Sequence, residues 1–383
     1  MKALFSNKQS IFFLLFLALL SCQHAEQKTD LDYKLLELDY AEGFKVYQGI
    51  GFKVLEVLQA FPGKHQPFRY LVMEQQGEIP KGKFDAIIQL PVKKVILTST
   101  TQIPHLEYLG ESSTLIGFPN LDLISSEKVR KMIHLGKVKD LGKGAQTNVE
   151  MVIDLAPDWI MISTLGEDLR NLDLFQKSGI PAPLNGEYLE GHPLGRAEWI
   201  KFTGALLGRW EEAHQAFEAI KNAYEEAEAL AKKNDQTHKP KIMSGVMYKD
   251  IWYVPGADSW GAKLIQAAGG DYGFKDHPGT GSIQLSYEYV FEKAQDADFW
   301  IGAADHNSLE EMGKADPRYT YFQAFQKGQV YTYTKKKGIK GGVEYFELGY
   351  LRPDLILKDL IKIMYPDILP DYTPYFYSRL NEK

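Results

Sequence analysis

The chain has 383 residues, of which 44% are hydrophobic, 25% charged and 13% aromatic, enough apolar side chains for a large core; this excludes wholesale disorder and a collagen-like rod. Its formal net charge of −6 argues against a protein that coats nucleic acid. A single cysteine excludes an intramolecular disulfide framework and a cysteine-rich zinc site.

Residues 1–22 have the pattern of an export signal. After a start that carries two lysines, Ile11–Leu20 is an unbroken run of ten apolar residues, too short to span a bilayer. The run ends in Leu-Leu-Ser-Cys22, which resembles the lipobox of bacterial lipoproteins. The resemblance implies that the chain is cut before Cys22, which is lipidated. The alternative is a buried N-terminal helix with an incidental cysteine.

A signal of this type predicts a location in the cell envelope. The mature chain loses two lysines and no acid, so its formal charge falls from −6 to −8. The body would face the periplasm, anchored to the membrane by lipid alone. Because exported proteins have no ATP supply, we do not expect a kinase or an ATPase.

The first part of the mature chain is predicted to be a tether followed by strands. Residues 23–32 are polar, and residues 33–90 alternate short apolar segments with glycines, a pattern typical of β-structure. We therefore expect residues 23–91 to form a tether and a β-rich N-terminal extension.

From Val92 onward, short buried strands alternate with helices, which predicts an N-terminal α/β lobe over residues 92–193 with a parallel sheet. The expected strands are 95–97, 115–117, 159–162 and 180–184, and the expected helices are 103–109, 149–155 and 172–178.

Residues 194–239 are predicted to be linker helices. Leu194–Leu207 has a helical pattern that Gly208 interrupts, and Trp210–Lys233 is one long amphipathic helix of roughly 36 Å.

A second α/β lobe is predicted over residues 240–383. Its expected strands are 241–247, 299–301 and 330–332, and its expected helices are 262–268, 287–294 and 352–364. The fold prediction is therefore α/β: two Rossmann-like lobes with parallel sheets, joined by one long interlobe helix and preceded by a β-rich extension.

Several segments, in their order along the chain, resemble the solute-binding proteins of bacterial ABC importers of the iron-siderophore, haem and cobalamin type. The resemblance covers residues 92–365, whereas the section 33–90 departs from the usual pattern. It implies two lobes with a mostly pre-formed ligand cleft between them. The segments are Lys94–Thr100, Asn148–Ile160, Leu264–Gly270 and Leu285–Glu288.

The resemblance also implies two contacts with a membrane permease. In this family one glutamate on top of each lobe pairs with arginines of the permease, and Glu150 and Glu288 stand at the matching positions. Charge pairs of this kind set orientation and association rate more than affinity. The alternative is that both are ordinary carboxylates near helix N-termini, stabilised by the helix dipole.

Candidate ligand-binding residues follow the carboxyl ends of the predicted strands, where ligands bind in α/β sheets. Aromatic side chains and arginine suit a large, flat, partly anionic chelate. The alternative is that the aromatic residues cover a core and that the segment 335–342, with four lysines and three glycines, is a solvated loop. The candidates are Ser99, Thr100, Thr101, Thr164, Leu165, Gly166, Tyr188, Arg196, Tyr248, Trp252, Tyr253, Trp260 and Lys337.

The sequence does not carry a recognised catalytic motif. Gly136–Gly144 has five residues between its glycines where a phosphate-binding loop needs four, and neither a Gly-x-Ser-x-Gly elbow nor a His-Glu-x-x-His helix occurs. His105 follows the first strand of the lobe, but partners for a bare metal ion are not visible. We therefore expect no enzyme activity and no resident cofactor or metal.

The leading hypothesis is a lipid-anchored binding protein that captures an iron-siderophore-type chelate and delivers it to an ABC permease through Glu150 and Glu288. A cobalamin or haem carrier of the same fold is the first alternative, with a tyrosine or histidine as the axial ligand of haem iron. An exported hydrolase or chelate-processing enzyme is the second. The third is an envelope interaction module that docks through residues 33–90. We expect no nucleic acid partner.

Overall fold

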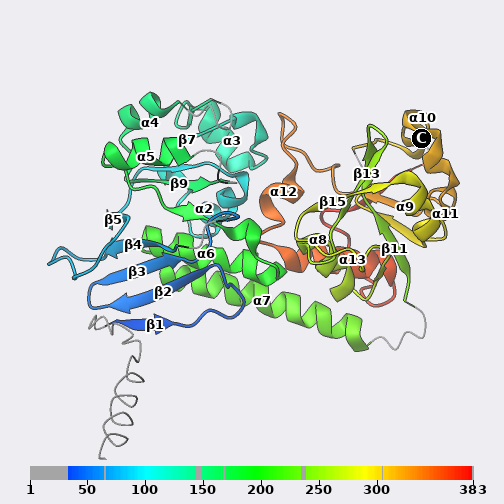
Figure 1. The fold of residues 1–383 in the computed structure, drawn as a ribbon, viewed down its shortest axis with the longest axis horizontal. Helices are drawn as coiled ribbons and strands as arrows, with labels where there is room; N and C mark the ends of the chain where they lie inside the picture. Colours follow the sequence, from blue (N-terminus) through cyan, green and yellow to red (C-terminus); the bar gives the residue numbers. More distant parts are fainter. Residues whose placement is uncertain are drawn as a thin grey trace, which may run out of the picture.

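The structure is a computed structural model that describes residues 33–63, 66–142, 148–164, 166, 169–233, 239–303 and 305–381. The predicted signal peptide with Cys22, and the ligand candidate Leu165, lie outside the described residues. The described chain forms three five-stranded sheets and one three-stranded sheet, arranged along the long helix α7 (Figure 1).

The N-terminal extension is a five-stranded sheet in the order β1-β2-β3-β4-β5, as the β-rich prediction required. The first four strands are antiparallel neighbours, and β5 runs parallel to β4. One face of the sheet is apolar and joins the main core against helix α6. The strands are β1 (Lys34–Leu36), β2 (Phe44–Gly49), β3 (Phe52–Val57), β4 (Phe68–Met73) and β5 (Ala86–Gln89).

Two buried carboxylates fasten the extension to the body. Glu198 accepts hydrogen bonds from the backbone N–H groups of residues 39, 40 and 41, at 2.9, 2.8 and 2.8 Å, and pairs with buried Lys201 at 2.7 Å. Glu190 accepts from Gly43 N–H at 2.8 Å and from Trp199 Nε1 at 2.9 Å. Because these groups are shielded from water, the extension is an integral part of the body.

The N-terminal lobe is built on a parallel sheet of order β10-β9-β6-β7-β8. After β6, the chain adds β7 and β8 on one side of that strand and then adds β9 and β10 on the other side. The order therefore reverses beside β6, at the position where ligands bind in open α/β sheets. The strands are β6 (Val95–Leu97), β7 (Leu115–Phe118), β8 (Lys139–Asp140), β9 (Trp159–Ser163) and β10 (Leu184–Asn185).

Three helices of this lobe were predicted, and α4 has the predicted bounds; α3 was not predicted. The helices of the lobe are α2 (Ile103–Tyr108), α3 (Glu127–His134), α4 (Val149–Leu155) and α5 (Leu169–Lys177), with the 3₁₀ turns η1 (Thr100–Gln102), η2 (Ser112–Thr114), η3 (Leu121–Leu123) and η5 (Glu187–Leu189).

Helices α6 (Pro193–Leu207) and α7 (Trp210–Lys233) connect the lobes. The left-handed conformation of Gly208, with φ of +71°, ends α6 where the sequence predicts a break. All 15 residues of α6 are buried, since the helix contacts the extension, α2 of the N-terminal lobe, and α8 (Trp260–Ala267) and α13 (Pro353–Met364) of the C-terminal lobe. α6 is therefore a core helix, not an exposed linker.

The C-terminal lobe has a five-stranded sheet of order β14-β11-β16-β17-β18, in which only β18 is antiparallel. The strand predicted over residues 241–247 is instead two strands, because Gly245, with φ of +85°, turns the chain into a separate antiparallel sheet of β12, β13 and β15. A side chain at Gly245 would clash with the carbonyl oxygen of Tyr253.

The strands of this lobe are β11 (Lys241–Ser244), β12 (Val246–Tyr248), β13 (Ile251–Pro255), β14 (Asp271–Tyr272), β15 (Ser282–Ser286), β16 (Phe299–Ile301), β17 (Val330–Thr332) and β18 (Ser378–Arg379). Its remaining helices are α9 (Tyr287–Ala294), α10 (Leu309–Ala315), η6 (Pro317–Tyr321), α11 (Gln323–Gln326) and α12 (Glu344–Leu348).

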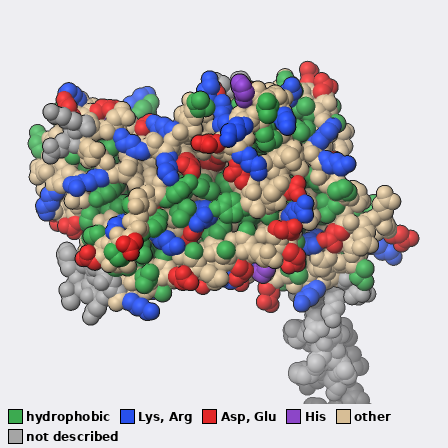
Figure 2. Space-filling view, turned by 180° about the vertical axis from the view of Figure 1, so that it is seen from behind, with side chains coloured by type: hydrophobic (Ala, Val, Ile, Leu, Met, Phe, Trp, Pro, Cys, Tyr) green, Lys and Arg blue, Asp and Glu red, His purple; other side chains and the backbone are tan. Residues whose placement is uncertain are grey.

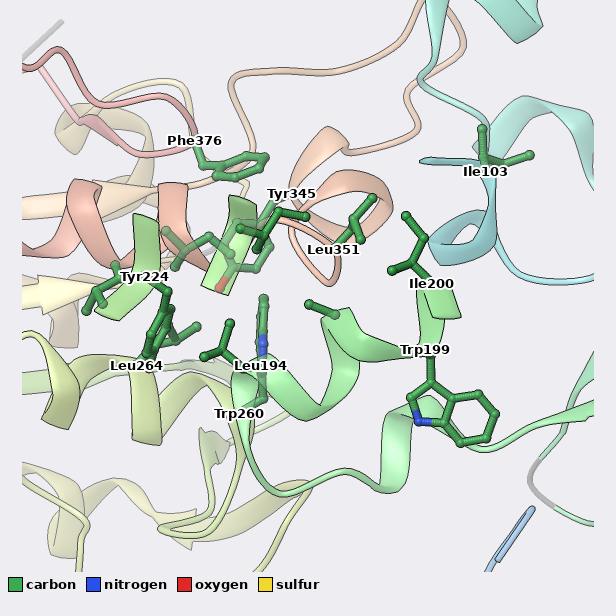
Figure 3. Packing of buried hydrophobic residues seen from close by; sticks show 14 of the residues in the cluster. Ile103, Leu194, Trp199, Ile200, Tyr224, Trp260, Leu264, Tyr345, Leu351 and Phe376 are labelled. Atoms are coloured by element: carbon green, nitrogen blue, oxygen red, sulfur yellow. The ribbon is translucent and has the colours of Figure 1, made fainter. Parts of the chain in front are cut away.

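One continuous hydrophobic core runs through the extension and both lobes. Figure 3 shows its central part, where Leu194 of α6 lies beside Trp260 of the C-terminal lobe, and Leu351 lies near Ile200. Since separating the lobes would expose this apolar surface, the packing favours a cleft that is largely pre-formed.

Within the described ranges, none of the helices combines the length and the apolar character needed to span a bilayer.

Candidate functional site

The carboxyl ends of the parallel strands of the N-terminal lobe are joined by side chains. Thr98, directly after β6, donates its hydroxyl hydrogen to the Met161 carbonyl at 3.1 Å and accepts from Ser163 N–H at 2.9 Å, both in β9. The turn that follows, η1, contacts α12 of the C-terminal lobe. This edge of the sheet therefore faces the other lobe, as the strand order predicts.

A buried carboxylate that the sequence analysis missed lies at this edge. Glu187 is 2% exposed and accepts a hydrogen bond from the Thr101 hydroxyl, which also contacts Ser99 Oγ at 2.8 Å. Burial raises the pKa of Glu187 to about 7, against the opposing effects of Thr101, Arg196 and Asn185. Its place directly after β10 was the available signal, but an isolated glutamate after a strand is usually exposed.

Arg196 connects this edge to the C-terminal lobe. Its Nη2 donates to the Tyr188 carbonyl at 2.8 Å and its Nε to the Glu190 carbonyl at 3.2 Å. Its guanidinium lies 4.7 Å from the ring centre of Tyr350 and 5.7 Å from that of Trp260, both in the C-terminal lobe. Cation–π contacts of this kind strengthen when water is excluded. We call Thr101, Glu187, Arg196, Trp260 and Tyr350 the interlobe polar cluster.

A segment of the C-terminal lobe, residues 336–348, crosses to the N-terminal lobe; we call it the strap. Its helix α12 lies between the two lobes (Figure 1). Glu347 of the strap accepts hydrogen bonds from the N–H groups of Ser125 at 2.6 Å and Ser126 at 2.8 Å, at the start of α3. Burial raises the pKa of Glu347 to about 7, and the negative charge of nearby Glu107 adds to the effect.

Two glycines allow the strap to lie directly on the N-terminal lobe. A Cβ atom at Gly338 would be 2.6 Å from Ser125 Cα, and one at Gly342 would clash with the carbonyl oxygen of Leu123. A further hydrogen bond joins the lobes, in which Arg352 Nη1 donates to the hydroxyl of Tyr108 at 2.7 Å.

Beside the strap, a cavity of about 1300 Å³ lies between the lobes. Seen from behind, the molecule is hollowed where the lobes meet, with hydrophobic side chains in the hollow and charged side chains of both signs around it (Figure 2). This volume is above the usual range for drug-sized ligands, so the cavity suits a large molecule. Its basic residues are Lys128, Arg130, Lys131, Lys337 and Lys340, its acidic residues are Glu107, Glu127, Glu344 and Glu347, and His134, Tyr108 and Tyr375 also line it.

The structure brings about half of the predicted ligand residues together. Thr101, Arg196 and Trp260 belong to the interlobe polar cluster, and Tyr188 reaches Thr164, donating to its carbonyl at 3.1 Å. The other candidates near this edge or the cavity are Ser99, bonded to Thr101; Thr100, in η1; Gly166, packed on Phe61; and Lys337, which lines the cavity and pairs with Asp305.

Trp252 was wrongly predicted to line the cleft. Its side chain is fully buried, its Nε1 donates to the Ser244 carbonyl at 3.1 Å, and its ring packs on Trp300 and Phe322. On the same small sheet, Tyr248 is 62% exposed at a hairpin turn and Tyr253 is half-buried on the middle strand. β13 buries Trp252 and Val254 on one face and leaves the other face partly exposed, but the sequence gives no local sign of which face a ligand would use.

Glu150 and Glu288 occupy matching positions. Each is the second residue of its helix, α4 or α9, and each is exposed. The helices are capped alike, since the side chain of Asn148 accepts from Met151 N–H at 3.0 Å and that of Ser286 accepts from Tyr289 N–H at 3.2 Å. Local capping thus explains why both carboxylates stand at helix N-termini.

The part of the chain that the structure describes holds no group of three or more His, Cys, Asp or Glu side chains placed to bind a metal ion. His105 is buried in the core with its Nδ1 at 2.8 Å from Thr203 Oγ1, and burial lowers the pKa of its ring to about 3.

The two-lobed fold is similar to that of solved periplasmic proteins, among them the following two. A possible iron-binding, periplasmic solute-binding protein of Staphylococcus epidermidis is 19% identical, with a TM-score of 0.56 over 72% of this chain and 99% of that one. A periplasmic haem-binding protein of Roseiflexus sp. RS-1 is 15% identical, with a TM-score of 0.56 and the same two coverages. At these identities the likeness shows the fold alone.

Relatives from Methanocaldococcus jannaschii cover more of the sequence. One uncharacterised lipoprotein is 29% identical over 304 residues, which is 77% of this chain and 70% of the relative. A second is 24% identical over 373 residues, 93% of this chain and 90% of the relative, so that match must extend into residues 33–90. Residues 95–337 match the model of a family described as periplasmic binding proteins, whose members bind solutes and are not enzymes. This chain belongs to that family.

Proposed function

We propose that the protein is a lipid-anchored, substrate-binding component of an ABC importer that captures a metal chelate of the iron-siderophore type. The observation that carries the proposal is the cavity of about 1300 Å³ between the two lobes, lined by both and bordered by five lysine and arginine side chains. The division into a signal segment (1–22), extension (23–91), N-terminal lobe (92–193), linker helices (194–239) and C-terminal lobe (240–383) is part of the proposal.

The chemistry of the cavity favours a large, partly anionic ligand. Five basic side chains outnumber four carboxylates in the lining and attract a negatively charged chelate, and Tyr108, which is 41% exposed, offers a flat surface on which it can stack. The interlobe polar cluster places the positive charge of Arg196 at the junction of the lobes. The lipoprotein relatives support a lipid anchor at Cys22.

Haem is the second candidate ligand, and cobalamin remains a third. His134, Tyr108 and Tyr375 all line the cavity, and either residue type can bind haem iron axially. A haem complex would show a Soret band whose position changes in a His134→Ala or Tyr108→Phe variant, whereas a ferric siderophore would not.

Ligand identity is tested by native mass spectrometry of the protein purified from its host, followed by titration of tryptophan fluorescence. A ferric chelate that binds tightly supports the proposal, and haem or cobalamin alone replaces the substrate. The charge argument is tested with Lys128→Glu plus Lys131→Glu, for which we expect at least tenfold weaker binding of an anionic chelate. Lys232→Glu, at the far end of α7, is the matched control. Equal affinity in the two variants would contradict an anionic ligand in this cavity.

Delivery to the permease is proposed to use Glu150 and Glu288. The double variant Glu150→Ala plus Glu288→Ala should bind the chelate normally but lose transport into proteoliposomes that contain the permease. Asp154→Ala plus Glu292→Ala, about one turn further along the same helices, is the matched control. Unchanged transport in the first variant would refute this docking.

A further inference from the structure

One end of the N-terminal sheet gathers features that the ligand cleft does not explain. β1 and β2 are antiparallel, with Lys34 opposite Gln48, so the described chain begins beside the turn that joins β2 to β3. Ile50 is at the tip of this turn and is 93% exposed. The most exposed large hydrophobic side chain in the described part of the molecule therefore lies where the N-terminal segment leaves the sheet.

The loop 74–85 projects from the same end (Figure 1). β4 ends at Met73, opposite Phe52, and the loop begins with N–H groups of Glu74 and Gln75 that donate to the Gly51 carbonyl at 2.8 and 3.3 Å. The loop is thereby held against the Ile50 turn. It carries a second exposed apolar side chain, Ile79, at 58%.

The two exposed isoleucines form an apolar tip at this end. Single exposed isoleucines are common on protein surfaces, but here two of them belong to adjoining turns. The loop itself carries no excess of positive charge, since Lys81 and Lys83 are outnumbered by Glu74, Glu78 and Asp85. The tip therefore offers a lipid surface apolar side chains rather than positive charge. We call Lys34, Ile50 and Ile79 the basal tip.

Covalent geometry places the basal tip near the membrane if Cys22 is lipidated. Cys22 precedes Tyr33, the first described residue, by 11 positions. A segment of that length spans at most roughly 40 Å even when fully extended. The lipid and the basal tip are therefore joined by a short segment that meets the body at the tip itself.

We propose that the basal tip is a second, peripheral membrane contact in which Ile50 and Ile79 enter the lipid headgroup region and Lys34 lies at the lipid surface. The inference rests on the lipid anchor of the proposed function. Weak lipid anchoring is commonly reinforced by a second, electrostatic or apolar contact. Such a contact would fix the orientation of the body, and hence of its cleft, relative to the bilayer.

The test uses the full lipidated chain, in which Cys22 is the only cysteine and its thiol is consumed by the lipid. Ile50→Cys provides one free thiol for the environment-sensitive fluorophore NBD, and Tyr321→Cys, 61% exposed in the C-terminal lobe, provides the matched control. Each protein is reconstituted with vesicles of phosphatidylcholine and phosphatidylglycerol. We expect NBD at position 50 to shift to shorter wavelength and to be quenched by nitroxide-labelled lipid, and NBD at position 321 to do neither.

Two further measurements distinguish a missing membrane contact at the basal tip from a missing lipid anchor or a loss of ligand binding. Co-sedimentation with vesicles reports the lipid anchor, and chelate titration reports the proposed ligand binding. If the protein sediments with vesicles while NBD at position 50 stays in water, the basal tip does not contact lipid and the inference is overturned, whereas the transport proposal stands. If the protein does not sediment at all, the anchor is absent and the inference falls with it.

Discussion

Two regions of this molecule use buried glutamates to hold backbone N–H groups of a distant segment, with different surroundings. Where the extension meets α6, Glu198 accepts from three N–H groups and pairs with Lys201, whose side chain is 2% exposed. Across the cleft, Glu347 accepts from two N–H groups and lies near a like charge, Glu107. Glu198 is therefore paired with an opposite charge, whereas Glu347 lies beside a like charge.

The difference indicates which junction is permanent. A buried carboxylate with a cation and several donors is costly to disrupt, because breaking it leaves a buried charge without a partner. A buried carboxylate beside another carboxylate is held less firmly, and its proton affinity rises. We therefore expect the extension to stay fixed to α6, and the strap to be the contact that releases when the cleft opens.

The largest expected effect is at the permanent junction. Glu198→Ala would leave Lys201 buried without its carboxylate and three N–H groups without an acceptor, and should lower the free energy of unfolding by about 3–5 kcal/mol. Urea denaturation measures this change. Glu212→Ala, which removes an exposed ion pair with Arg209, is the control and should cost less than about 1 kcal/mol. Equal losses of unfolding free energy in the two variants would contradict a permanent junction held by Glu198.

The second effect concerns the pH dependence of the strap. The pKa of Glu347 in the closed arrangement, about 7, lies above its ordinary value of 4.5, so the closed form binds this proton more tightly than an open form would. Closure should be most favoured below pH 4.5 and should weaken as the pH rises through about 7, by about 3 kcal/mol in all.

Spin labels at Leu174→Cys and Tyr321→Cys, exposed sites in the two lobes, would report the distance between the lobes across this pH range. Glu347→Gln cannot ionise and should remove the pH dependence. A distance that stays constant with pH in the unmodified strap would show that Glu347 does not govern closure.

The third effect is steric. A methyl group at Gly342 would meet the Leu123 carbonyl, so Gly342→Ala should lift the strap and disfavour closure by about 1–3 kcal/mol. The same spin-label pair would record a longer mean distance. Gly77→Ala, where no heavy atom lies within 4 Å of the added Cβ, is the control and should leave the distance unchanged.

The smallest effect is at the edge of the lobe contact. Tyr108→Phe removes the hydroxyl that accepts from Arg352 Nη1 at 2.7 Å, and should weaken closure by about 1 kcal/mol. Small-angle scattering well above pH 7, where Glu347 is fully ionised and the strap is weakest, would be the most sensitive measurement. Tyr248→Phe, in an exposed turn of the C-terminal lobe, should have no effect on closure.

Local sequence patterns predicted much of the secondary structure. Helices α4, α7 and α9 and strands β16 and β17 have the predicted bounds. The reason is that their ends depend on neighbouring residues, as with the capping side chains of Asn148 and Ser286. The same local signals suffice to place Glu150 and Glu288 at helix N-termini.

The sequence by itself therefore determined the α/β class, the alternation of strands and helices, the long helix α7 and the general position of ligand residues at strand ends. Only the tertiary structure decided which of those residues meet. Glu347 and Ser125 are 222 positions apart, and Trp252 and Trp260, both predicted to line the cleft, divide between the core and the interlobe polar cluster. A local pattern shows which face of an element is apolar, but contacts between distant segments depend on how the whole chain packs.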